Sequence, residues 1–190
     1  MAFKELVISS RSCRRFREDE KISREILEEL VDLARLSPSG GNRQPLKFYL
    51  ENSPGGNSKI FPHLAWAGYL SDWDGPEEGE RPAAYIIILQ DTRIRENPGC
   101  DHGIAAQSIL LGAAEQGFRG CMIGSVKRER LSEDLGLDGR YRIMLVVALG
   151  FPAEEAVLEE MPENGSIKYW RGEDGRHHVP KRALEEIIIH

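Results

Sequence analysis

The sequence predicts an α+β or α/β layer protein, and three observations support this fold class. Helix-like and strand-like segments alternate along the 190 residues. The runs 83–90 (AAYIIILQ) and 142–150 (RIMLVVALG) are apolar except for one polar residue at an end, which is typical of strands covered on both faces. A chain of this length buries roughly 70% of the surface that its unfolded form exposes, enough for a real core. We therefore expect one domain over residues 1–190, since no repeat or low-complexity linker divides it.

The N-terminal quarter predicts two helices and a strand. Residues 2–9 suit a short helix, and Ser23 suits the N-cap of the next one. The second helix has a single buried stripe, because its apolar residues recur at helical spacing: Ile26, Leu27, Leu30, Val31, Leu33 and Ala34. Pro38 should stop this helix. The stretch "LKFYLE" from Leu46 then predicts a strand.

The central helix is expected to begin with Asp101 as its N-cap and to end at Gly117. It is apolar nearly all round, which is typical of a helix buried in a large core or against a second chain. In so small a protein we favour a subunit interface. A strand at 119–124 and an amphipathic helix through Leu135 follow. The tail ends in three isoleucines before the last residue and should be docked somewhere.

Composition and charge exclude several classes. The net charge of −6 argues against nucleic acid or anionic membranes as partners, and no apolar run reaches the ~20 residues of a membrane helix. Three scattered cysteines and the lack of a signal-peptide pattern favour a reduced, cytoplasmic setting. The sequence contains no GxGxxG, P-loop, GxSxG, HExxH or CxxC motif, so we expect no metal site and no nucleophile elbow.

Basic residues crowd the stretch "SRSCRRFR", residues 10–17. Arg11 and Arg14, with Ser12 as a neutral donor, suit a phosphate, although a solvated cluster is an equal interpretation. Cys13 lies among these cations, which would lower its pKa, but an inert core cysteine is the more ordinary reading. A second basic pair, Lys181 and Arg182, can meet a phosphate or lie on the surface.

Small polar residues fill the stretch "SPSGGNRQP", residues 37–45. Ser39, Asn42 and Gln44 offer donors and acceptors that can read the polar edge of a flavin ring. A plain helix-to-strand turn is the alternative. In "CMIGS", Gly124 can expose its N–H to a ligand, or it can form a simple turn with Ser125 as a cap.

Taken in order, these stretches resemble the nitroreductase family of FMN-dependent oxidoreductases. The matching segments are "RSCRRF", "SPSGGNRQP", "DHGIAAQSILLGAAEQGF", "CMIGS", "IMLVVALGFP" and "PKRALEEII". The resemblance implies an α+β fold with a central mixed or antiparallel sheet flanked by helices. It also implies an intertwined homodimer with FMN at the interface and the C-terminal tail exchanged onto the partner.

The resemblance assigns cofactor contacts residue by residue. Arg11, Ser12 and Arg14 match the phosphate- and ribityl-binding motif, and Arg14 is our candidate cation near the flavin N1 edge. The loop along the flavin, supplied by the other subunit, is matched by Pro38, Ser39, Asn42 and Gln44. Gly124 and Ser125 match the segment near the ring. Lys181 and Arg182 match the late basic pair that completes the phosphate site. No catalytic acid or base is required.

The expected activity is electron transfer from NADH or NADPH through FMN to a nitroaromatic, quinone or similar small-molecule acceptor, with donor and acceptor binding alternately. Three alternatives remain open. One is another flavin redox reaction, such as reductive dehalogenation or dehydrogenation of a ring. A flavin-sequestering protein without turnover is the second, and a nucleic-acid-binding regulator is the third and weakest. The short 62–82 region contains Trp66, Tyr69 and Trp73, which suit either a flavin cover or core packing.

Overall fold

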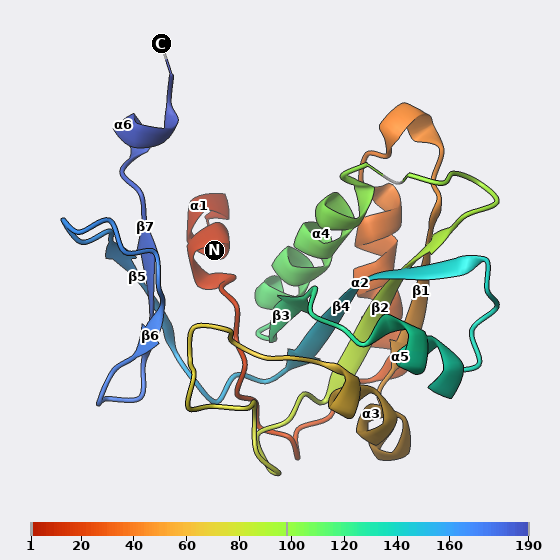
Figure 1. Cartoon of the computed structure of the whole chain (residues 1–190), viewed down its shortest axis with the longest axis horizontal. Coiled ribbons are helices and arrows are strands. Elements are labelled where there is room, and N and C mark those ends of the chain that lie inside the picture. The colour runs from red at the N-terminus through yellow and green to blue at the C-terminus, as the bar shows by residue number, and fades with distance from the viewer. Residues whose placement is uncertain (1, 98, 190) are drawn as a thin grey trace.

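The computed structural model describes residues 2–97 and 99–189 and has a mixed helix-and-sheet fold (Figure 1). Its main sheet is antiparallel throughout, with the strand order β1-β2-β4-β3. The four strands are β1 (Leu46–Glu51), β2 (Ala84–Asp91), β3 (Arg119–Ile123) and β4 (Tyr141–Gly150). The predicted α+β class with an antiparallel sheet is therefore confirmed.

Helices cover both faces of the main sheet. On one face lie α2 (Arg24–Leu36) and α4 (Asp101–Glu115), and on the other lie α3 (Pro54–Ile60) and α5 (Arg128–Asp134) (Figure 1). The short α1 (Phe3–Ser9) precedes them, and the 3₁₀ turns are η1 (Gly40–Asn42) and η2 (Phe61–His63). The helix α3 was not predicted from the sequence.

The strand β2 shows why an unbroken apolar run belongs in the middle of this sheet. All eight of its residues are buried. Alternate side chains point to opposite faces of a strand. Ile86 and Ile88 accordingly join the core beneath α2 and α4, whereas Ile87 and Leu89 join the core beneath α3 and α5. The prediction that this strand is covered on both faces is confirmed.

Most predicted helix ends are confirmed, with one correction. The Ser23 side chain caps α2 by accepting from the Ile26 N–H at 3.3 Å. Gly117 ends the central helix with φ 89°, a conformation that glycine adopts readily. Asp101, however, is the first residue of α4 and not its N-cap, which is Cys100. The carboxylate of Asp101 is thereby available for contacts outside the helix.

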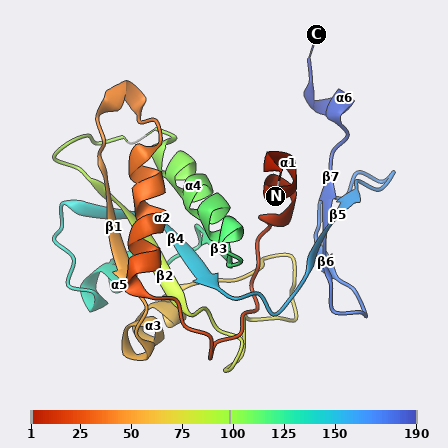
Figure 2. The same cartoon turned by 180° about the vertical axis from the view of Figure 1, so that it is seen from behind.

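A second, smaller sheet was not predicted. It consists of β5 (Ala156–Glu160), β6 (Trp170–Arg171) and β7 (His177–Lys181) in the order β5-β7-β6. The two views place it apart from the main sheet, beside α1 (Figures 1 and 2). Beyond it the chain runs outward through α6 (Leu184–Ile187), and Ile189 is 96% exposed. Docking of this apolar tail remains a prediction.

The segment that carries Arg14 is held between distant parts of the chain. The Cys13 N–H donates to the Gly120 carbonyl on β3 at 3.0 Å, and the Ala153 N–H donates to the Arg15 carbonyl at 2.9 Å. The Phe16 N–H donates to the Glu80 carbonyl at 2.9 Å. Main-chain hydrogen bonds therefore fix this segment independently of any ligand.

No helix within residues 2–97 and 99–189 has the length and apolar character that a bilayer span demands.

Candidate functional site

A cavity of about 160 Å³ lies where β3 ends, and Arg14 forms part of its wall. It is bordered by Arg14, Ala65, Trp66, Ala67, Gly68, Cys121, Met122, Ile123, Gly124 and Ser125. The main chain at Gly124 is open, because a Cβ placed there would meet only the side chain of Leu145, at 3.8 Å. The structure thus brings together three predicted cofactor-binding residues, Arg14, Gly124 and Ser125.

Arg14 is only 9% exposed, and its side chain and main chain are held on several sides. Its Nη1 donates to His177 Nε2 at 3.1 Å, and the guanidinium lies 4.8 Å from the centre of the Tyr169 ring. The Arg14 main-chain N–H donates to Glu154 Oε1 at 2.6 Å. A charged side chain held this way keeps one orientation without a ligand, which favours a preorganised binding site.

His177 is 1% exposed and faces this cation as a neutral ring. Burial, with a further contribution from the positive charge of Arg14, lowers the pKa of His177 to about 4. Because a guanidinium only donates hydrogen bonds, Nε2 must be the acceptor, and the ring proton is then on Nδ1. No hydrogen-bond partner for Nδ1 is found among the described residues.

Glu154 ties the second sheet to the Arg14 segment. Its side chain is 2% exposed and accepts from the main-chain N–H groups of Arg14 and Arg15, at 2.6 and 3.2 Å. Its other oxygen accepts from Arg171 Nη2 at 2.8 Å. The Arg171 guanidinium in turn lies 4.9 Å from the centre of the Trp73 ring. One buried carboxylate therefore joins β6, the N-terminal motif and the 62–82 region.

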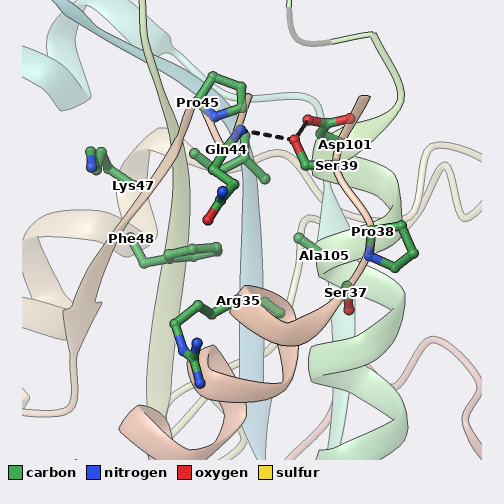
Figure 3. Close-up of a pocket in the computed structure, with 12 residues that line it drawn as sticks. Arg35, Ser37, Pro38, Ser39, Gln44, Pro45, Lys47, Phe48, Asp101 and Ala105 are labelled. Atoms are coloured by element: carbon green, nitrogen blue, oxygen red, sulfur yellow. Dashed lines mark hydrogen bonds between the residues drawn. The ribbon is translucent and has the colours of Figure 1, made fainter. Parts of the chain in front are cut away.

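A second cavity, of about 260 Å³, lies between the C-terminal end of α2, β1 and the start of α4 (Figure 3). Pro38, Ser39 and Gln44 line it. The Ser39 hydroxyl donates to Asp101 Oδ2 at 2.7 Å and accepts from the Gln44 main-chain N–H at 2.9 Å. Asn42 is exposed outside the cavity wall, and its carbonyl and side-chain oxygens accept from Gln44 Nε2, each at 3.2 Å.

The other predicted phosphate contacts are spread over the single chain. Arg11 lines a third cavity, of about 530 Å³, which Arg119 also borders. Its Nη2 donates to the Val7 carbonyl at 2.7 Å, and its buried Nε has no partner within the described ranges. Ser12 is exposed but lies beside the Arg14 cavity, because its side chain is in hydrogen-bond contact with the Cys121 thiol. Lys181 and Arg182, at the end of β7, are exposed as well. One chain thus forms separate groups and does not bring all eleven predicted residues together.

Of the two interpretations of Cys13, the structure supports the inert core cysteine. Cys13 is 3% exposed, and burial raises its pKa to about 12 despite the neighbouring cations. Burial likewise raises the pKa of the Cys121 thiol at the Arg14 cavity. Cys100 is exposed. Cys13 is therefore an inert core residue.

Residues 8–151, more than half of the chain, match the Nitroreductase family. The chain belongs to the nitroreductase family. Among curated proteins, this nitroreductase is 25% identical to "Putative NAD(P)H nitroreductase YdgI" of Bacillus subtilis, over 89% of this chain and 97% of that protein.

Solved structures share the fold. A nitroreductase family protein of Clostridium difficile 630 has a TM-score of 0.68 at 23% identity, and the comparison covers 100% of this chain and 98% of that one. "A putative nitroreductase in complex with FMN" from Exiguobacterium sibiricum also has a TM-score of 0.68, at 19% identity, with 80% of this chain and 89% of that one covered.

Sequence patterns carry no signal for the residues that hold Arg14. Glu154 follows a strand in an acidic stretch, and Tyr169 lies in a loop without a motif. His177 belongs to no sequence motif, and no group of three candidate metal ligands is found among the described residues. In the 62–82 region, Trp66 borders the Arg14 cavity, whereas the Tyr69 ring lies 5.0 Å from that of Tyr169. The aromatic residues there thus contribute both to the cavity and to packing.

Proposed function

We propose that this nitroreductase binds FMN and transfers electrons from NADH or NADPH to a small-molecule acceptor, such as a nitroaromatic or a quinone, with donor and acceptor binding alternately. The observation that carries the proposal is the preorganised Arg14 guanidinium beside the open main chain at Gly124. The name of the Bacillus relative, which includes NAD(P)H, and the FMN of the Exiguobacterium structure support it.

The residues fit an FMN-sized polar ligand. When bound, FMN supplies the hydride and electron chemistry. Arg14 provides a fixed positive charge, which favours the anionic character that a reduced flavin develops at N1. The exposed amides of Asn42 and Gln44 provide donors and acceptors for the polar edge of a ring. Arg11, Ser12, Lys181 and Arg182 provide the cations and donors that a phosphate requires.

The cavity sizes support a site shared by two chains. The cavities at Arg14 and at the 38–44 loop, of about 160 and 260 Å³, each fall below the ~300–1,000 Å³ of typical small-molecule sites, whereas the Arg11 cavity, of about 530 Å³, falls within this range. We therefore propose a homodimer in which the 38–44 loop of one chain completes the Arg14 cavity of the other. The exposed apolar tail supports this proposal, because Leu184, Ile187, Ile188 and Ile189 have little to pack against in one chain.

The decisive experiment is an absorbance spectrum of the purified protein, followed by mass identification of the compound that heat releases. We expect a flavin spectrum, FMN in the supernatant and a dimer in solution. Anaerobic mixing with NADH or NADPH should bleach the flavin faster than free FMN. Bleaching at the rate of free FMN would favour a flavin-sequestering protein, and a colourless monomer that ignores added FMN would overturn the proposal.

Arg14→Ala tests the residue that carries the proposal. Loss of a charge-assisted hydrogen bond costs about 1.5–3 kcal/mol, so FMN should bind about 10- to 150-fold more weakly. Arg17→Ala is the matched control, because Arg17 is exposed in the same basic stretch and pairs with Glu20. An Arg14→Ala protein as yellow as the wild type would show that this arginine does not bind the cofactor.

A further inference from the structure

We propose that Asp101 is a positioning residue that sets the 39–44 loop, so that the Asn42 and Gln44 amides meet the polar edge of the flavin ring. This inference rests on the proposed function and extends it, because neither the sequence patterns nor the family resemblance assigned Asp101 a role in the site.

The loop has a conformation that its own sequence disfavours. Three of its residues have positive φ: 62° at Gly41, 53° at Asn42 and 51° at Gln44. Glycine adopts such angles readily, but residues with a side chain do so at a cost. The positive φ angles of Asn42 and Gln44, which lie on either side of Arg43, persist only where surrounding contacts hold them, and strain of this kind concentrates at ligand-binding sites.

Asp101 supplies the contacts that hold the loop. It lies outside the loop and is only 4% exposed. Its Oδ2 accepts from the Ser39 hydroxyl at 2.7 Å, and its Oδ1 accepts from the Gly40 N–H at 3.0 Å. The Ser39 hydroxyl accepts in turn from the Gln44 N–H at 2.9 Å (Figure 3). The carboxylate thus fixes the first residues of the loop directly and the last one through Ser39.

The position of Asp101 in the fold suits an anion. It is the first residue of α4, where the free N–H groups and the helix dipole favour negative charge. The Arg95 guanidinium also lies close, because a Cβ on Gly40 would be 3.0 Å from Arg95 Nη1 and 3.5 Å from Asp101 Oδ1. Gly40 thereby allows the loop to approach both charged groups.

This arrangement assigns different roles to the polar residues of the loop. The Ser39 hydroxyl already makes two hydrogen bonds within the chain, so its role is to transmit the position of Asp101. Asn42 and Gln44 are joined through Gln44 Nε2, and both side chains are exposed. With the exposed Arg43, they are the side chains of the loop left to contact a ligand, and the position of Gln44 depends on the Asp101 carboxylate through Ser39.

The test uses Asp101→Ala and Asp101→Asn, with Glu25→Ala as the matched control. Glu25 is also an acidic first-turn residue, in α2, but it is exposed and lies at the end of α2 away from the loop. The first readout is amide hydrogen exchange at Gly40 and Gln44 in cofactor-free protein. Asp101→Ala should accelerate exchange at both amides by at least about tenfold, because a hydrogen bond to a charged group is lost.

The second readout is the absorption spectrum and midpoint potential of bound FMN. Asp101→Ala should shift both, and Glu25→Ala should shift neither. Asp101→Asn should keep the spectrum and potential close to those of the wild type, because its amide oxygen still accepts from Gly40 and its NH₂ can donate to Ser39. If Asp101→Ala does not fold, Ser39→Ala breaks the connection to Gln44 and leaves the start of α4 intact.

The outcomes separate the two proposals. Unchanged exchange at Gly40 and Gln44 in Asp101→Ala, or at Gln44 in Ser39→Ala, overturns the positioning role. Faster exchange with an unaltered flavin spectrum and potential overturns the link to the cofactor. A wild-type protein that binds no FMN overturns the proposed function and the flavin part of this inference, while the exchange data still decide whether Asp101 sets the loop.

Discussion

Acidification should destabilise this protein through one buried histidine. His177 is enclosed, and its Nε2 accepts a hydrogen bond from Arg14, so the folded protein resists its protonation. The unfolded chain does not. Replacing His177 with glutamine removes the titration and keeps an oxygen that can accept from the guanidinium.

The magnitude follows from the two pKa values. The pKa of His177 falls from 6.5 to about 4 on folding, mainly by burial and then by the charge of Arg14. Above pH 6.5 both states are neutral there, so the group adds no pH dependence. Below pH 6.5 only the unfolded state gains the proton, and stability falls as the pH falls towards 4. At about 1.4 kcal/mol per pH unit, the loss over this window is about 3 kcal/mol.

Urea unfolding from pH 7.5 to pH 4 measures this loss. Other groups titrate in the same range, so the informative quantity is the wild-type free energy of unfolding minus that of His177→Gln. We expect this difference to change by about 3 kcal/mol in favour of the variant as the pH falls. His102→Gln, in α4, controls for loss of a histidine as such. If wild type and His177→Gln lose stability in parallel, the inference that His177 is buried and neutral in the folded protein is wrong.

Three further outcomes are expected. Gly120→Ala should cost about 1–3 kcal/mol in urea unfolding, because the new Cβ would lie 2.5 Å from the Ala148 carbonyl oxygen, and a wild-type midpoint would contradict this packing. Glu154→Ala should cost about 3–5 kcal/mol, since Arg171 loses its buried partner, and a smaller loss would show that the pair is solvated. A thiol reagent should modify Cys100 in the native protein, and the two buried cysteines only after denaturation; fast labelling of all three would refute their burial.

Local patterns predicted the elements of the main sheet well, because each carries its own signal. The apolar run of β2 and the stripe of α2 report burial directly, and Ser23 and Gly117 mark helix ends by chemistry that acts within a few residues. The second sheet had no such signal. Its strands are short and half-exposed, and β5 pairs with β7 about twenty residues later in the sequence.

The candidate site was predictable in kind but not in arrangement. Residue types placed Arg14, Gly124 and Ser125 among the ligand-binding candidates, and the structure gathers these three around one cavity. Sequence spacing carried no information on His177 or Glu154, whose contacts with Arg14 span 163 and 140 residues. Long-range contacts of this kind arise from the tertiary fold.

The hydrogen bonds between Glu154 and the Arg14 segment have a consequence for biosynthesis. A chain emerging from the ribosome presents Arg14 early, but its carboxylate partner lies 140 residues later. At roughly 5–20 residues per second, translation leaves the basic stretch without that partner for about 7–28 s. The nascent N-terminal motif must wait for the last quarter of the polypeptide, so truncated translation products should lack an ordered Arg14 even when their main sheet has formed.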